Sequence, residues 1–114
     1  MKPDERDPLE IEVQQTEGRT LVMVAGDLDA STASHLYDAL SDLELAEARQ
    51  VVIDLAKVTF MDSTGLSVLV TEHKRLEHVN GHLTIFSPPS SIRRLFEITG
   101  LAKTLDIVPA DEER

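Results

Sequence analysis

The side chains best suited to chemistry in this sequence lie together at Asp62-Ser63-Thr64-Gly65, between an apolar segment and a helical pattern. Two hydroxyls and a carboxylate therefore stand at the predicted N-terminus of a helix, where backbone N–H groups have no partner within the helix. Such groups accept a capping oxygen or an added phosphate. The segment is a candidate switch site with Ser63 as phosphate acceptor, and a second interpretation is that Asp62 or Ser63 only caps the helix.

Two enzyme classes use residues of this kind. The Asp-Thr/Ser-Gly sequence of aspartic proteases is similar, and a chain of this length could supply one half of a dimeric site. Here, however, an extra residue separates Asp62 from Gly65, and a helix follows where a protease needs a β-rich chain. Serine acyl transfer lacks its G-x-S-x-G motif, and no His is placed to serve Ser63. We therefore expect no catalytic residue and no enzyme.

Metal and cofactor chemistry has no motif behind it. The sequence has no Cys, and His73 and His78 are five residues apart, which places them on different faces of a helix. There is also no Gly-rich segment of the kind that holds a nucleotide phosphate. We expect no metal and no cofactor.

The charge of the chain limits its partners. The net charge of −10 over 114 residues opposes binding to nucleic acid or to an anionic membrane. No apolar run approaches the ~18 residues that span a bilayer, and the charged N-terminus lacks a signal-peptide core, so we expect a cytoplasmic domain. Six acids and no Lys or Arg lie between Thr20 and Ala48: Asp27, Asp29, Asp38, Asp42, Glu44 and Glu47. They form either a solvated helix face or a surface that attracts a basic protein partner.

Hydrophobic periodicity predicts alternating strands and helices. The predicted strands are 9–13, 21–25, 51–55, 83–86 and a short one at 105–108, and the predicted helices are 33–43, 63–79 and 92–98. Gly26-Asp27-Leu28-Asp29 is expected to break the second strand, and Asp29 or Ser31 to cap the first helix. Asn80-Gly81 and Gly100 are the predicted ends of the later helices.

This order predicts an α/β fold: a mixed, mostly parallel sheet of four to five strands, opened by a β-hairpin, with about three to four helices packed on it. One domain is expected over 9–108, with flexible tails at 1–8 and 109–114, the latter acidic. In such sheets functional groups gather where strands end. The loops at 26–31 and 61–65 both follow strands, so we expect them to form one site.

Three segments resemble a known family. Residues 26–33, GDLDASTA, are similar to the G-E-L-D-x-x-T-A loop of STAS-domain anti-sigma factor antagonists. Residues 51–55 and 58–66, VVIDL and VTFMDSTGL, resemble the signature strand and D-S-[ST]-G-L switch of that family, and residues 96–101, FEITGL, resemble its closing helix. The resemblance covers about residues 9–108, although Ser67 stands where the family often has Gly.

The resemblance implies a partner-switching function. The unmodified chain would bind an anti-sigma factor that is also a Ser/Thr kinase with an ATPase domain of the histidine-kinase-like fold, and would thereby free a sigma factor. That kinase would phosphorylate Ser63, with Thr64 as rival acceptor, and so end the binding. A PP2C-type phosphatase would reverse the modification.

The same resemblance assigns residues to the binding surface. Asp62, Ser63, Thr64 and Gly65 would form the acceptor loop, and Asp27, Asp29, Ser31 and Thr32 the companion loop that faces the partner. An alternative keeps the fold without the phosphate cycle: a STAS adaptor in a larger signalling assembly or in a lipid-transport complex.

Overall fold

The structure, a computed structural model of the 114-residue chain, describes residues 9–43 and 49–110. Its elements are β1 (Leu9–Thr16), β2 (Arg19–Leu28), α1 (Ala33–Ser41), β3 (Gln50–Met61), α2 (Ser63–Glu77), β4 (His82–Phe86), α3 (Ser90–Thr99), the 3-10 helix η2 (Leu101–Lys103) and β5 (Asp106–Val108). Glu44, Glu47 and the predicted tails, apart from Pro109 and Ala110, lie outside the described residues.

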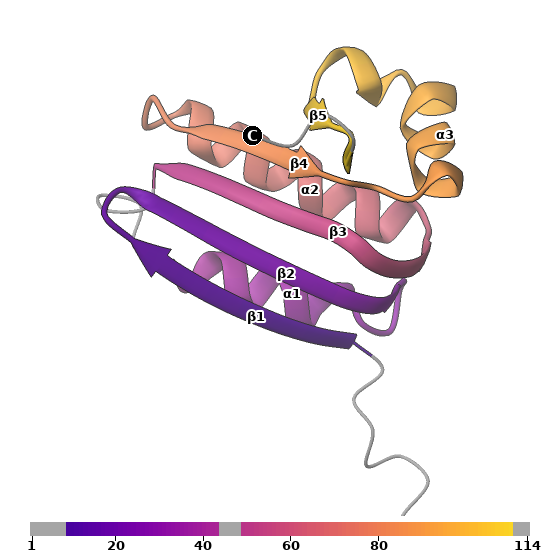
Figure 1. The fold of residues 1–114 in the computed structure, drawn as a ribbon, viewed down its shortest axis with the longest axis horizontal. Helices are drawn as coiled ribbons and strands as arrows, with labels where there is room; N and C mark the ends of the chain where they lie inside the picture. The colour runs from indigo at the N-terminus through magenta and orange to yellow at the C-terminus, as the bar shows by residue number, and fades with distance from the viewer. Residues whose placement is uncertain (1–8, 44–48, 111–114) are drawn as a thin grey trace, which may run out of the picture.

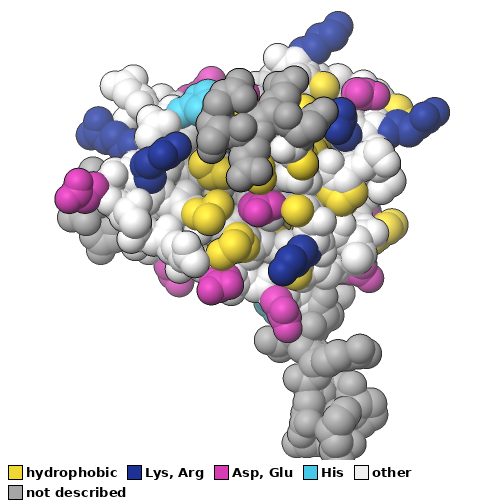
Figure 2. All heavy atoms as spheres, viewed as in Figure 1, with side chains coloured by type: hydrophobic (Ala, Val, Ile, Leu, Met, Phe, Trp, Pro, Cys, Tyr) yellow, Lys and Arg dark blue, Asp and Glu magenta, His cyan; other side chains and the backbone are white. Residues whose placement is uncertain are grey.

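The five strands form one sheet in the order β1-β2-β3-β4-β5. β1 and β2 pair antiparallel as a hairpin, and the three other pairs are parallel. The predicted fold class is therefore confirmed. Helices α1 and α2 both cover the same face of the sheet, and α3 lies at the end of the molecule beside β4 and β5 (Figure 1). On the other face, hydrophobic side chains of the described residues gather over the middle among a few charged ones (Figure 2).

The core lies mainly between the sheet and the two covering helices, and Phe96 of α3 also belongs to it. Alternate residues of the strands, such as Val22 and Ile53, are 0% exposed because every second side chain points to the helices. Leu36 of α1 and Leu69 of α2 meet them with 0% exposure. Burying each such side chain contributes about 1.5–3 kcal/mol, so these contacts hold the helices to the sheet.

The first three strands all end later than predicted, β1 at Thr16. β2 continues through Gly26 to Leu28, where the sequence predicted a break, and β3 continues beyond Leu55 to Met61. The pairing of β2 with β3 has register shifts at Met23/Ala25 and Gly26/Asp27, which accommodate the irregular segment without ending the ladder. Leu28 consequently pairs with Met61, so both strands end at the same edge of the sheet.

Candidate functional site

The site begins with Ser63, the first residue of α2. Its side chain is exposed, and its hydroxyl has no hydrogen-bond partner among residues 9–43 and 49–110. An exposed, unbonded hydroxyl at the positive end of a 15-residue helix is accessible to a second macromolecule.

Asp62 caps this helix and fixes the loop. Its Oδ1 accepts hydrogen bonds from the backbone N–H groups of Thr64 at 2.9 Å and Gly65 at 3.3 Å. The Thr64 hydroxyl also donates to Asp62 Oδ1, at 2.5 Å. This bond from the Thr64 side chain is the main reason that the pKa of the Asp62 carboxyl lies below its ordinary value. Because the cap is Asp62, the interpretation of Ser63 as the capping residue does not hold.

The companion loop is organised around Asp29. Its Oδ1 accepts from the Ser31 hydroxyl at 2.8 Å and from the Ser31 N–H at 3.0 Å, and these bonds lower the pKa of the carboxyl. Thr32 is only 1% exposed, and its hydroxyl donates to the Asp27 carbonyl at 2.7 Å. Thr32 therefore shapes the loop and stands at the N-cap position of α1, for which Asp29 or Ser31 was predicted; it makes no side-chain capping bond there.

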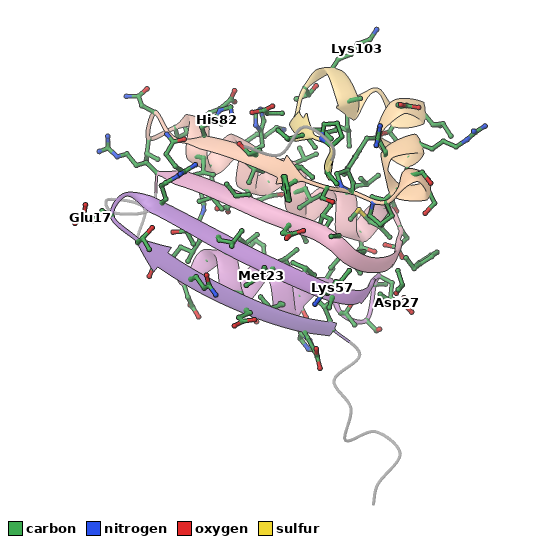
Figure 3. All side chains as sticks on the ribbon, viewed as in Figure 1. Glu17, Met23, Asp27, Lys57, His82 and Lys103 are labelled. Atoms are coloured by element: carbon green, nitrogen blue, oxygen red, sulfur yellow. The ribbon has the colours of Figure 1, made fainter. Side chains whose placement is uncertain are left out.

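The structure brings the two loops together, as predicted. The Asp62 N–H donates to the Leu28 carbonyl at 3.2 Å, and the Thr59 hydroxyl donates to Asp27 Oδ1 at 2.6 Å. Gly65 packs tightly in the same place, since a Cβ there would lie 2.9 Å from Leu28. Asp27 lies at the end of the sheet opposite to the β1–β2 turn that Glu17 marks (Figure 3). We call the two loops, residues 26–32 and 59–65, the loop edge.

Among the eight residues that the sequence assigned to the site, the structure separates surface from support. Ser63, Thr64, Ser31 and Asp27 are exposed, whereas Thr32 and Gly65 are buried and act through the shape of the loops. Sequence reasoning quoted Thr59 and Phe60 only within the 58–66 motif and gave neither residue a role, because the predicted strand ended at Leu55. The signal that could have found them is the apolar and β-branched run of residues 58–61, which extends the strand pattern.

Comparison with known proteins places this geometry in a family. The model of the STAS domain family matches residues 10–113. The anti-sigma-B factor antagonist of Listeria monocytogenes is 39% identical over 92 residues, which cover 81% of this chain and 81% of that protein. The protein of the same name from Staphylococcus aureus is 36% identical over 86 residues, covering 75% of this chain and 80% of that protein.

A solved structure agrees. The crystal structure of an anti-sigma factor antagonist from Mycobacterium paratuberculosis superposes with a TM-score of 0.80 at 29% identity, covering 96% of this chain and 90% of that one. The chain belongs to the STAS domain family. The names of these relatives describe antagonists of another regulatory factor, in line with the prediction that this chain is not an enzyme.

Two further findings concern the predicted membrane and metal properties. Within residues 9–43 and 49–110, no helix is both long and apolar enough to cross a membrane. In the same part of the chain, no group of three or more His, Cys, Asp or Glu side chains is arranged to hold a metal ion.

Proposed function

We propose that this chain is a cytoplasmic anti-sigma factor antagonist whose binding is switched by phosphorylation of Ser63. In its unphosphorylated form the chain binds an anti-sigma factor that is also a Ser/Thr kinase, and a sigma factor is released. The kinase transfers phosphate to Ser63, the complex dissociates, and a PP2C-type phosphatase restores the hydroxyl. The observation that carries the proposal is the exposed, unbonded Ser63 hydroxyl at the start of α2.

The geometry favours Ser63 over Thr64 as the acceptor. The Thr64 hydroxyl lies 2.5 Å from Asp62 Oδ1, so phosphorylation of Thr64 would break a bond within the cap and place a dianion against a carboxylate. Phosphorylation of Ser63 leaves the bonds of Asp62 to Thr64 and Gly65 in place. In this mechanism the chain supplies one hydroxyl, and the kinase supplies ATP, Mg²⁺ and the catalytic base.

The phosphate acts on binding more than on the fold. A phosphoserine adds about −1.5 to −2 charges and three acceptor oxygens. The N-terminus of α2 favours this charge and the neighbouring Asp62 carboxylate opposes it, so the two effects on the fold offset in part. At an interface that receives a neutral hydroxyl, the dianion must be desolvated. A penalty of ~4 kcal/mol would weaken binding about a thousandfold.

The test compares variants at two positions of α2. Ser63→Ala should keep the fold and bind the kinase as tightly as the unphosphorylated wild type, but should resist phosphorylation. Ser63→Asp should bind about a hundredfold more weakly, which corresponds to ~3 kcal/mol. Ser67→Asp is the matched control, because Ser67 is also exposed and lies one helical turn away, and it should weaken binding much less.

Binding is measured by titration calorimetry with the kinase from the source cell, and the acceptor is identified by phosphopeptide mapping after incubation with kinase and ATP. Equal affinities of Ser63→Ala and Ser63→Asp would remove the switch. A phosphorylated Thr64 with an unmodified Ser63 would show that the assignment of Ser63 as the acceptor is wrong. If a transporter ATPase co-purified with the chain in place of a kinase, the adaptor function would be favoured.

A further inference from the structure

Phe60 is an aromatic side chain that the fold leaves half exposed beside the loop edge. The chain has only three Phe, one Tyr and no Trp. Phe96 is 0% exposed in the core, whereas Phe60 is 50% exposed near the end of β3, two residues before Asp62. Single apolar residues on a surface are common, so exposure alone does not indicate a function. The position of Phe60 is what distinguishes it.

Strand pairing and the two neighbours of Phe60 in the chain, Thr59 and Met61, hold its backbone in place. Phe60 pairs with Asp27 across the β2–β3 ladder, and the Thr59 hydroxyl donates to Asp27 Oδ1 at 2.6 Å. Met61, the next residue, is 6% exposed and packs against the core. An aromatic ring on such a strand has two side-chain torsions to fix on binding, so its contact area is gained at low entropic cost.

The loop edge that contains Phe60 carries three carboxylates and no Lys or Arg, and Lys57 lies on β3 just before it. Asp27 lies opposite to Phe60, and Asp29 and Asp62 belong to the same loop edge. Hydrogen bonds hold the pKa values of Asp29 and Asp62 below their ordinary range, so both carboxylates are charged near pH 7. An exposed aromatic side chain on a segment that also carries charged groups fits the usual arrangement of an interface hot spot, in which the apolar centre is desolvated and the rim stays polar.

We propose that Phe60 is the apolar anchor with which the loop edge binds its protein partner, and that this partner presents an apolar pocket bordered by Lys and Arg side chains. This inference rests on the proposed function, because it takes the partner to be the kinase that modifies Ser63. Phe60 accounts for affinity and the choice of partner, and the Ser63 hydroxyl accounts for the switch. Phe60 makes no contact with the reacting atoms in this proposal, so it is a docking residue and not a catalytic one.

The experiment uses a matched pair of surface aromatics. Tyr37 on α1 is 49% exposed, so Tyr37→Ala removes an aromatic ring of nearly the same exposure as Phe60→Ala does. The affinity of the unphosphorylated chain for the kinase is measured for both variants. Phe60→Ala should raise Kd at least about tenfold, Tyr37→Ala should change it by less than about twofold, and Phe60→Leu should recover part of the loss. The melting temperatures verify that all three variants fold.

A second measurement separates docking from chemistry. Since Phe60 contributes to binding and not to phosphoryl transfer, Phe60→Ala should raise KM for phosphorylation of Ser63 and leave kcat unchanged. Equal Kd values for wild type and Phe60→Ala would overturn the inference and leave the proposed function intact. Equal losses in Phe60→Ala and Tyr37→Ala would also overturn it, because no single anchor would exist. A wild-type chain that binds no kinase would overturn the proposed function, and this inference with it.

Discussion

At the scale of single residues, Gly65 sets how closely the two loops approach each other. A Cβ at this position would lie 2.9 Å from the Leu28 side chain, the Leu28 carbonyl oxygen and the Met61 side chain. The carbonyl belongs to the backbone of β2 and has little freedom to move. Gly65→Ala should therefore lower the free energy of unfolding by about 1–3 kcal/mol, even though Ala favours a helix by about 1 kcal/mol. Urea unfolding measures this change.

The control for Gly65 is Thr71→Ala, at an exposed position of the same helix. This change leaves packing untouched and should keep or slightly raise the stability, because Ala has the higher helix propensity. If Gly65→Ala were as stable as the wild type, the two loops could move apart without cost. Their close approach at Gly65 would then have no structural role.

Asp62 links the helix cap to pH. The folded chain lowers the pKa of Asp62 and of Asp29 below the ordinary 3.8, so the ionised carboxylates favour the folded state. Their contribution is fully present above the unfolded value of 3.8 and is lost as the pH falls through the lowered folded values. We therefore expect these two groups to keep the melting temperature of the wild type steady as the pH is lowered to 4. Below pH 4 the melting temperature should fall.

Two substitutions of Asp62 separate charge from capping. Asp62→Asn keeps an acceptor for the Thr64 and Gly65 N–H groups but carries no charge, so it should lose part of the acid dependence and keep most of the stability at pH 7. Asp62→Ala removes the acceptor and should lower the melting temperature by about 4 °C at pH 7. Thermal unfolding between pH 2 and pH 7 measures both effects. If the melting temperature of Asp62→Asn fell at low pH as much as that of the wild type, Asp62 would not be a source of the acid dependence.

At the scale of elements, Arg75 joins the two helices that cover the sheet. Its Nε lies 3.1 Å from Oε1 of Glu72, which is 3% exposed, and its guanidinium also donates to the Leu40 carbonyl near the C-terminus of α1. Carbonyls in the last turn of a helix have no partner within it. The Leu40 carbonyl also accepts from the Leu43 N–H at 3.2 Å, so Arg75 adds a second bond at the end of α1 and compensates a buried charge on α2.

Removal of Arg75 should be costly and should depend on pH. Burial raises the pKa of Glu72, and Arg75 opposes that rise. Arg75→Met would leave the Glu72 carboxylate buried without a partner, at a cost of about 3–5 kcal/mol. With a folded pKa above the unfolded value of 4.5, stability is lost as the pH rises through the folded value. The loss should therefore be larger at pH 7 than at pH 4.5, as urea unfolding at the two pH values would measure.

Controls for the contacts of Arg75 lie within the same chain. Arg93→Met changes an exposed arginine of α3 and should have little effect at either pH. The double change Arg75→Met with Glu72→Leu should recover much of the stability, because no buried charge remains. If Arg75→Met lost the same amount at both pH values, the cost would come from packing or from the Leu40 carbonyl and not from Glu72.

The elements also show where sequence periodicity is informative. α2 begins at Ser63 and α3 ends at Thr99 with Gly100 as its C-cap at φ 81°, because capping and left-handed turns depend on local residue types. The continuation of β2 through Gly26 depends instead on pairing with β3, and a single strand carries no record of its partner's register. The burial of Glu72 was also not predicted, because it depends on how α2 packs against other elements. The bonds of Arg75 to Glu72 and to the Leu40 carbonyl of α1 mark this contact.

At the scale of the whole molecule, the site could be predicted in outline and not in detail. Parallel strands that end at one edge place the 26–31 and 61–65 loops together, as sequence reasoning expected, whereas the family resemblance assigned Asp27 to the binding surface. Sequence reasoning did not separate Ser31 on the surface from Thr32 below it, because the two adjacent hydroxyl residues differ only in where the loop turns them. It also gave no role to Phe60, the proposed anchor, whose exposure follows from the length of β3.

The net charge of −10 belongs to the molecule as a whole and predicts how the chain meets its partner. Between Thr20 and Leu43 the acids Asp27, Asp29, Asp38 and Asp42 occur without any Lys or Arg. If these acids attract a basic partner surface, the attraction is screened when the Debye length falls from about 30 Å at 0.01 M salt to about 3 Å at 1 M. The association rate with the kinase should then fall by tenfold or more, while the dissociation rate changes less.

Stopped-flow mixing of the chain with the kinase at these two salt concentrations measures both rates. The double variant Asp38→Asn with Asp42→Asn removes two exposed charges of α1 and its C-cap while leaving the loop edge intact. It should associate more slowly than the wild type at low salt and at the same rate at high salt, because long-range attraction acts only where screening is weak. Equal association rates of wild type and variant at low salt would mean that these acids only keep a helix face solvated. Any long-range attraction of the partner would then come from the acids of the loop edge itself.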